Sequence, residues 1–211
     1  MSGAHERGVR RAGLFTLEGK LAIVTGALGL LGREFCEALL EAGAVVVVAD
    51  LDGDGCRRRA EELGDAYGRR AFGHALDVTS PESLTRLREA VRGHGHGTID
   101  VVVNSAAIND TFDEGRAATL SRFENYPLEL WRRSLDVNLT GTFLVCQILG
   151  TVMAEQRHGS IVNVASTYGL VGPDQRIYAR PDGSQGFWKS AAYAAGKAGV
   201  VGLTKFLAAY W

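Results

Sequence analysis

Short apolar runs alternate along this chain with longer helical stretches, and this alternation limits the possible folds more than any other feature. The predicted strands cover residues 21–25, 44–49, 70–77, 99–103 and 160–165. Helices are predicted between them, at residues 81–92, at 127–156 and from Ala191 onward. Strands that alternate with helices pair in parallel through right-handed crossovers. The near-continuous valines at 45–48 and 101–103 indicate strands that are buried on both faces. We therefore expect an α/β fold with a Rossmann-like, doubly wound parallel sheet.

Length and composition are those of one globular domain. The chain has 211 residues, of which 46% are hydrophobic and 22% charged, and its formal net charge is -1. Without a basic surface, neither nucleic acid nor an anionic membrane is expected as a partner. No stretch was expected to reach the ~20 apolar residues that span a bilayer. The three cysteines show no metal-like spacing and resemble reduced thiols, with Cys36 and Cys146 expected to be buried on helices.

The two ends of the sequence differ in character. Residues 1–13 contain arginines and glycines without an apolar run, so they are read as a flexible N-terminal arm and not as a signal peptide. The remaining residues, 14–211, form the single predicted globular domain. These features favour a cytoplasmic location. His94 and His96 lack a Cys or acidic partner at ligand spacing, so no metal site is expected.

A glycine-rich turn joins the first apolar run to the first amphipathic helix. Its sequence, Thr25-Gly26-Ala27-Leu28-Gly29-Leu30-Leu31-Gly32, places glycines where a tight turn must bring backbone amides close to a pyrophosphate. The helix N-terminus that follows favours negative charge. The alternative is that these glycines serve packing alone.

Asp50 closes the second apolar run, eighteen residues after Gly32. A carboxylate at this position suits the ribose diol of NAD and repels the 2′-phosphate of NADP. The next residue, Leu51, brings no positive charge that could bind this phosphate. NAD is therefore favoured over NADP, although a carboxylate at a strand end also forms plain turns.

Tyr193 and Lys197 are four residues apart in a helix rich in small residues, so their side chains share one helix face. A phenol transfers protons poorly at neutral pH, and a neighbouring cation stabilises its phenolate. The pair is therefore read as a proton-transfer device, against the alternative of an ordinary helix-surface contact.

These features, taken in their order along the chain, resemble the short-chain dehydrogenase/reductase family, in its classical branch. The likeness runs from about Leu14 to the last residue. It rests on Asp77-Val78 after the third strand, Asn104-Ser105-Ala106-Ala107 after the fourth, Asp136-Val137-Asn138-Leu139-Thr140-Gly141 in a helix, Ile161-Val162-Asn163-Val164-Ala165-Ser166 along the fifth strand, and Tyr193 with Lys197.

The resemblance implies an oxidoreductase that transfers a hydride between nicotinamide and a small alcohol or ketone. Tyr193 would be the general acid and base, Lys197 would assist it and bind the nicotinamide ribose, Ser166 would hydrogen-bond the substrate oxygen, and Asn138 would hold a water linked to Lys197. The cofactor would contact a set of residues on the strand ends: Thr25, Gly26, Leu28, Gly29, Leu30, Leu31, Gly32, Asp50, Leu51, Asp77, Val78, Asn104, Ala106, Tyr193 and Lys197. A homo-oligomer, a dimer or tetramer, is expected. For Asn138 the alternative is a helix Asn bonded to backbone.

Several features depart from the family pattern. The spacing of Gly26, Gly29 and Gly32 resembles the extended branch, whose members often act on nucleotide sugars. Ser105 and Ala107 replace the usual Asn and Gly, a change expected to alter packing more than chemistry. An insertion at residues 172–189 widens the Ser166–Tyr193 separation to about twice the usual length. Its cations could meet a carboxylate, phosphate or polyol, or it could be a solvated loop; similar insertions in relatives are associated with sugar pathways.

The helix that carries Tyr193 still continues at Trp211, where family members usually add two further strands and a lid. A shortened product or fragment is expected, or a partner that supplies the missing edge. The leading hypothesis is an NAD-dependent alcohol or ketone oxidoreductase. One alternative is a truncated, catalytically silent dinucleotide-binding protein. Another is a nucleotide-sugar epimerase or dehydratase, against which the lack of a C-terminal substrate domain counts.

Overall fold

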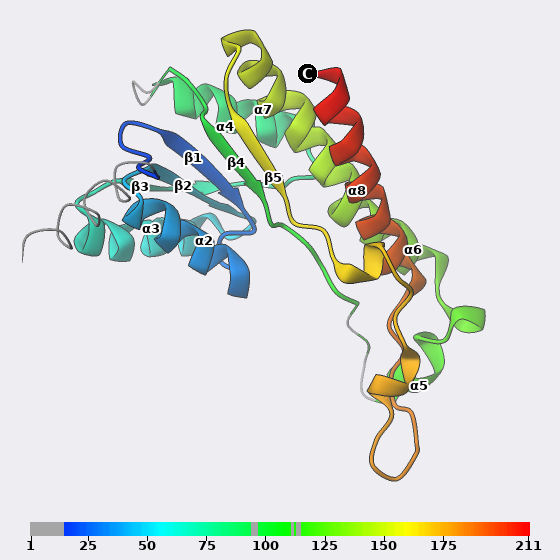
Figure 1. Ribbon diagram of the computed structural model, residues 1–211. Coiled ribbons are helices and arrows are strands. Elements are labelled where there is room, and N and C mark those ends of the chain that lie inside the picture. The colour runs from blue at the N-terminus through cyan, green and yellow to red at the C-terminus, as the bar shows by residue number, and fades with distance from the viewer. Residues whose placement is uncertain (1–14, 94–96, 111, 113–114) are drawn as a thin grey trace, which may run out of the picture.

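Five parallel strands form the sheet at the centre of the protein. The computed structural model describes residues 15–93, 97–110, 112 and 115–211, so the predicted arm at residues 1–13 lies outside the described residues, as do His94 and His96. The strand order is β3-β2-β1-β4-β5 (Figure 1). Their bounds are β1 Leu21–Thr25, β2 Val45–Asp50, β3 Ala71–Ala75, β4 Val101–Asn104 and β5 Ser160–Asn163. Each predicted strand is present, and the doubly wound α/β fold is confirmed.

Helices cover both faces of the sheet. On one face lie α2 (Leu30–Glu41) and α3 (Gly53–Tyr67), and on the other lie α4 (Pro81–Gly93) and α7 (Thr142–Gln156). The helix α8 (Ala191–Tyr210) follows the edge formed by β5 (Figure 1). The helix α6 (Leu128–Leu135) leads into α7 through a single π-helical segment, η2 (Asp136–Gly141).

The residues of β1 alternate between two hydrophobic cores. Ala22 and Val24 pack toward α2 and α3, while Leu21 and Ile23 pack toward α4 and α7. Because successive side chains point to opposite faces and both faces are covered, neither set can be polar. This explains why the strand is a continuous apolar run in the sequence.

The helical stretch Leu128–Gln156 corrects one expectation. It is 29 residues long with a mean hydropathy of 1.5 in its most apolar window, so by length and composition alone it could span a bilayer. Half of that window is buried within the protein, since α7 packs against β4, β5 and α4. A helix enclosed by the sheet and a neighbouring helix is apolar for reasons of packing.

Two irregular segments interrupt the alternation, and the second of them is the expected insertion. The first contains the short helix α5 (Ala117–Leu120) and the 3₁₀ turn η1 (Phe123–Asn125). The second, the insertion at residues 172–189, contains the 3₁₀ turn η4 (Gln175–Tyr178) and an antiparallel bridge between Ala179 and Gln185. In Figure 1 both segments lie at the same end of the molecule, beyond the carboxyl ends of the strands.

The three cysteines are buried free thiols on α2, α3 and α7. Burial raises the pKa of Cys36 to about 12 and those of Cys56 and Cys146 to about 11. The thiols therefore stay protonated at neutral pH and act as small apolar side chains.

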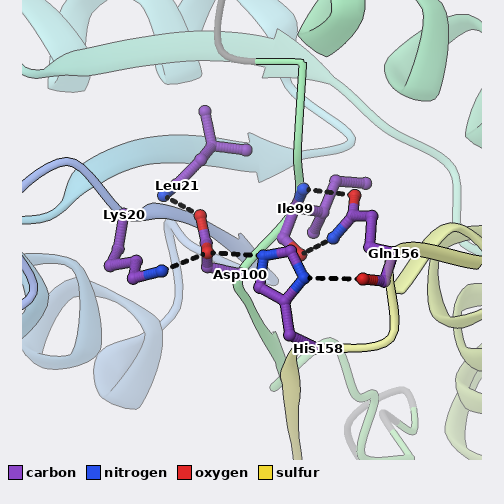
Figure 2. A network of polar contacts seen from close by, with 6 residues as sticks. All are labelled: Lys20, Leu21, Ile99, Asp100, Gln156 and His158. Carbon is purple, nitrogen blue, oxygen red and sulfur yellow. Dashed lines mark hydrogen bonds and ion pairs between the residues drawn. The ribbon is translucent and has the colours of Figure 1, made fainter. Parts of the chain in front are cut away.

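A polar network joins the amino ends of β1, β4 and β5 (Figure 2). The carboxylate of Asp100, whose side chain is 7% exposed, accepts hydrogen bonds from the Leu21 N–H and the Lys20 ammonium, each at 2.9 Å. His158 Nε2 lies 3.4 Å from the same carboxylate. Burial alone would raise the pKa of Asp100, but the Leu21 N–H, the Lys20 ammonium and His158 together lower it.

We expect Asp100→Asn to lower the free energy of unfolding by about 1–3 kcal/mol at about pH 7, because a buried anion loses its charge-assisted bonds. Because the pKa of Asp100 is lowered in the folded state, its ionised form stabilises the protein above the ordinary carboxyl pKa of ~3.9. This stability is lost as the pH falls through the lowered pKa. The difference between variant and wild type should therefore shrink at about pH 3. Urea unfolding at both pH values measures it.

Asp65→Asn, an exposed change on α3, is the control for the loss of one carboxylate. If the two variants lose equal stability at neutral pH, the network does not hold these strand ends together.

Candidate functional site

The carboxyl ends of β1 and β4 lie side by side at the middle of the sheet. After β1 the chain turns toward the face covered by α2, and after β4 it leaves for the other face, toward α7. Neighbouring parallel strands whose connections leave in opposite directions create a crevice at their carboxyl ends, where open α/β sheets bind ligands. Most of the residues singled out in the sequence lie along this edge.

The glycine-rich turn is held directly against the segment after β4. Gly26 has a φ of +64°, and a Cβ there would lie 2.6 Å from the Cα of Ala106. Thr25 Oγ1 accepts hydrogen bonds from the N–H groups of Ser105 and Ala106, both at 3.2 Å. A Cβ at Gly32 would collide with the backbone of Gly26. Only glycine readily adopts the conformation at Gly26, and only glycine permits the close approach at both positions.

The first turn of α2 has free backbone donors facing the crevice. Gly29 is its N-cap and brings no side chain to accept their hydrogen bonds, while Leu30 and Leu31 beside it are 85% and 52% exposed. Uncapped N–H groups at a helix N-terminus bind anions, and the glycines leave room for close approach. These residues fit the pyrophosphate of a dinucleotide.

Asp50 connects the turn to the end of β2. One carboxylate oxygen accepts the Leu28 N–H at 3.0 Å and the other accepts the Leu51 N–H at 2.8 Å. Each oxygen keeps a free lone pair, so the carboxylate can still accept hydroxyl groups. The next residue, Leu51, lines a cavity of about 440 Å³ together with Asp77. The neighbouring Val78 is buried and contacts the position of Gly141.

Asn104 points into the core and not toward the crevice. Its amide donates to Asn163 Oδ1 at 2.8 Å and contacts the Cys146 sulfur at 3.5 Å. Asn163 in turn donates to Thr204 on α8. The side chain therefore ties β4 to β5 and α7, while Ala106 meets the crevice through its backbone.

Asn138 is completely buried in the π-helical segment η2. Its Oδ1 accepts the Ile108 N–H at 2.8 Å, and its amide donates to the Ile108 carbonyl at 3.0 Å and to Ser134 Oγ at 3.2 Å. Both amide N–H groups are thus used within the protein. The side chain fixes the segment after β4, which matches the alternative of an Asn bonded to backbone.

Ser166 follows β5 and caps the 3₁₀ turn η3 (Thr167–Gly169), its hydroxyl accepting the Tyr168 N–H at 3.1 Å. The turn lies directly on α8, because a Cβ at Gly169 would be 2.6 Å from the carbonyl carbon of Lys197. Gly169 was not identified from the sequence, since a glycine required by a distant helix gives no local signal. This contact sets the distance between the strand that carries Ser166 and the helix that carries Lys197.

Tyr193 lies in the first turn of α8, three residues after Ser190, whose hydroxyl caps that helix at the Tyr193 N–H. Lys197 is 4% exposed, and its ammonium donates to the Val164 carbonyl at 2.6 Å. The same ammonium lies 6.0 Å from the centroid of the Tyr193 ring. Burial lowers the pKa of Lys197. The structure thus places the predicted pair on one helix face, beside the end of β5.

A second lysine lies closer to the phenol. Lys189 Nζ is 3.9 Å from the Tyr193 ring centroid and donates to Asn109 Oδ1 at 2.6 Å. The sequence placed this lysine among the cations of the insertion but gave no reason to prefer it. Arg176, by contrast, is exposed and pairs with Asp174. Among the described residues no group of three or more His, Cys, Asp or Glu could hold a metal ion.

Comparisons with known proteins agree with this geometry. A family model described as short chain dehydrogenase matches residues 20–179. The chain is 37% identical over 197 residues to D-threitol dehydrogenase of Mycolicibacterium smegmatis, covering 93% of this chain and 66% of the relative. It is 35% identical over 192 residues to a 3-oxoacyl-(acyl-carrier-protein) reductase of Aquifex aeolicus, covering 91% and 68%. The chain thus spans about two thirds of the length of these relatives.

Solved structures show the same likeness. An NAD⁺-bound xylitol dehydrogenase is 27% identical with a TM-score of 0.75, and the match covers 90% of this chain and 64% of that one. An NADPH-dependent 3-quinuclidinone reductase from Rhodotorula rubra is 25% identical with a TM-score of 0.75, covering 95% and 67%. The family match, the ordered motifs and the shared fold together show that the chain belongs to the short-chain dehydrogenase family of oxidoreductases, which bind NAD or NADP.

Proposed function

We propose that this protein is an NAD-dependent dehydrogenase that interconverts a secondary alcohol and a ketone on a small polyol or sugar-like substrate. The observation that carries the proposal is the arrangement around α8. The Tyr193 phenol lies in the helix's first turn with the Lys197 ammonium buried beside it. A partly positive helix N-terminus and two flanking ammoniums all favour a phenolate over a phenol.

In the oxidation direction, Tyr193 Oη would take the proton of the substrate hydroxyl. Bound NAD would supply the acceptor for the hydride of the carbinol carbon. The oxygen of the C–O bond thus loses a proton, its carbon loses a hydride, and a ketone remains. Ser166 Oγ, which receives the Tyr168 N–H, would donate its own hydrogen to the substrate oxygen. Reduction of a ketone would run these transfers in reverse.

Lys197 would support both partners of the reaction. One of its three N–H groups is used by the Val164 carbonyl, which leaves two for the nicotinamide ribose or a water. Asn138 has no free amide N–H, so a water that it holds must donate to one of its oxygens. Asn138 would therefore act chiefly by fixing the segment after β4.

Several residues support NAD in preference to NADP. The Asp50 carboxylate lies at the end of β2 beside the exposed Leu51, and its free lone pairs suit the two hydroxyls of an adenine ribose. A 2′-phosphate there would face an anion without a compensating cation on Leu51. The NAD⁺-bound xylitol dehydrogenase agrees with this choice, whereas the NADPH-dependent relative shows that the fold accepts both cofactors.

The substrate class is proposed from the site and the relatives together. Two of the proteins that this chain resembles, D-threitol dehydrogenase and xylitol dehydrogenase, are named for polyol substrates. Near Tyr193 the hydroxyl of Tyr178, from the insertion, lies 2.9 Å from the hydroxyl of Tyr168 in η3. Hydroxyl groups that both donate and accept are suited to a polyhydroxy substrate. We also propose a cytoplasmic, homo-oligomeric enzyme.

We expect Tyr193→Phe to reduce turnover of polyols with NAD by about 10²–10⁴-fold, because the proton acceptor is removed. NADH affinity, measured by quenching of intrinsic fluorescence, should stay within about twofold, since the phenol oxygen carries little of the binding. Turnover is followed by NADH absorbance over a panel of tetritols and pentitols. Phe206→Leu, an exposed change far along α8, is the control. A folded Tyr193→Phe variant with full activity would contradict the assigned role.

We expect Asp50→Ser to raise the affinity for NADPH relative to NADH by about tenfold, because the like-charge repulsion toward a 2′-phosphate is removed. Asp65→Ser, an exposed change near the end of α3, makes the same change in net charge away from the strand end. Dissociation constants from fluorescence titration give the ratio for each variant. An equal shift in both would mean that overall charge, and not the Asp50 carboxylate, selects the cofactor.

A further inference from the structure

Of the two lysines beside the Tyr193 ring, the one nearer to the ring centroid comes from the insertion and not from the Tyr193–Lys197 motif. Lys189 Nζ lies 3.9 Å from the centroid of the Tyr193 ring, whereas Lys197 Nζ lies 6.0 Å from it. A cation within ~6 Å of an aromatic face is attracted by the ring. The attraction grows when the ring bears a full negative charge, as it does in a phenolate.

The insertion holds the backbone of Lys189 in place. The Gln175 side chain accepts the Lys189 N–H at 2.9 Å and donates to the Lys189 carbonyl at 3.0 Å. The backbone carbonyl of Gln175 in turn accepts the Gln185 amide at 2.9 Å. Three parts of the insertion are thus connected around one lysine, immediately before the cap of α8 at Ser190.

The ammonium itself is held by a different segment of the chain. Asn109, in the segment after β4, accepts its hydrogen bond at 2.6 Å. The amide oxygen is neutral, so it orients the ammonium without cancelling its charge. Lys189 is half-buried, which limits screening of that charge by water.

We propose that Lys189 is a second cation of the acid–base site, which stabilises the Tyr193 phenolate from the ring face while Lys197 does so from within the protein. This inference rests on the proposed function of Tyr193. It gives the insertion a purpose, because the longer connection between β5 and α8 supplies both Lys189 and the Gln175 side chain that holds it.

Other charged and titratable groups also face this site. Lys197 lies on the same helix, and Tyr178 of η4 lies close by, hydrogen-bonded to Tyr168 of η3. Burial raises the pKa of Tyr178 to about 12, so it stays neutral over the working range. Burial lowers the pKa of Lys189, and the charge of Asp110 opposes that shift. As the pH rises, Lys189 therefore loses its proton, and with it the ability to stabilise the phenolate, at a lower pH than an exposed lysine would.

The test compares wild type with Lys189→Met, Lys189→Arg and Asn109→Ala. In each background the phenolate of Tyr193 is titrated by near-ultraviolet absorbance, with the matching Tyr193→Phe double variant as the blank. We expect Lys189→Met to move the titration midpoint upward by about one pH unit, through loss of one adjacent positive charge. Lys189→Arg keeps the positive charge, so its midpoint should stay close to that of wild type. Asn109→Ala should give a smaller upward shift than Lys189→Met, because the ammonium is no longer held.

Lys205→Met is the matched control, since it removes an exposed lysine from the same helix. Its midpoint should equal that of wild type. In parallel, the acidic limb of kcat/KM for polyol oxidation should move upward in Lys189→Met by the same amount, with NADH affinity unchanged. A residue that only shaped the loop would change KM without moving this limb.

The outcomes separate this inference from the function on which it rests. A wild-type enzyme that oxidises polyols, combined with unchanged midpoint and acidic limb in Lys189→Met, would overturn the role of Lys189 alone. If the Tyr193 midpoint moves in Lys189→Met but the wild-type protein oxidises no alcohol, the pairing of Lys189 with Tyr193 would be supported and the proposed function refuted. If Lys189→Met does not fold, as judged by circular dichroism, an unchanged midpoint in Asn109→Ala overturns the inference.

Discussion

Burial of a parallel sheet on both faces is the constraint from which the rest of this structure follows. Parallel strands need long crossovers, and the crossovers here place α2 and α3 on one face and α4 and α7 on the other. Because every strand then runs in one direction, all carboxyl ends lie along one edge of the sheet. The change of face between β1 and β4 opens the crevice at that edge. The site is thus a consequence of how the apolar strands are covered, and loops need only supply its chemistry.

The sequence predicted those parts whose cause is local. The strands β1, β2 and β4 were visible as apolar runs, and the turn at Gly26 was visible because a tight strand-to-helix turn requires glycine. Tyr193 and Lys197 were paired correctly because helical geometry alone places them on one face. The length of the apolar stretch within Leu128–Gln156 was misjudged, since a helix covered by β4, β5 and α4 carries few polar residues.

What the sequence could not predict depends on contacts between distant segments. Asn104 follows a strand in the expected position, yet its amide turns inward to Asn163, fifty-nine residues away. Gly169 matters only because α8 lies against it. Lys189 was one of three cations in the insertion, and its selection depends on Asn109, which is eighty residues distant. Composition and spacing do not contain these pairings, because each arises when the crossovers bring the segments together.

The proposed catalytic edge also shows how one helix terminus can combine several weak electrostatic effects. Ser190 caps α8 and so fixes where its positive end lies, and Tyr193 occupies the turn in which the helix dipole is strongest. Lys197 is held by the Val164 carbonyl at the end of β5, so the sheet itself positions this ammonium. Each contribution alone is modest in water, but a half-buried setting reduces screening and lets them act together on one oxygen. A substitution that shifts β5 relative to α8, such as a larger residue at Gly169, would therefore disturb the proposed proton transfer without altering Tyr193 or Lys197 themselves.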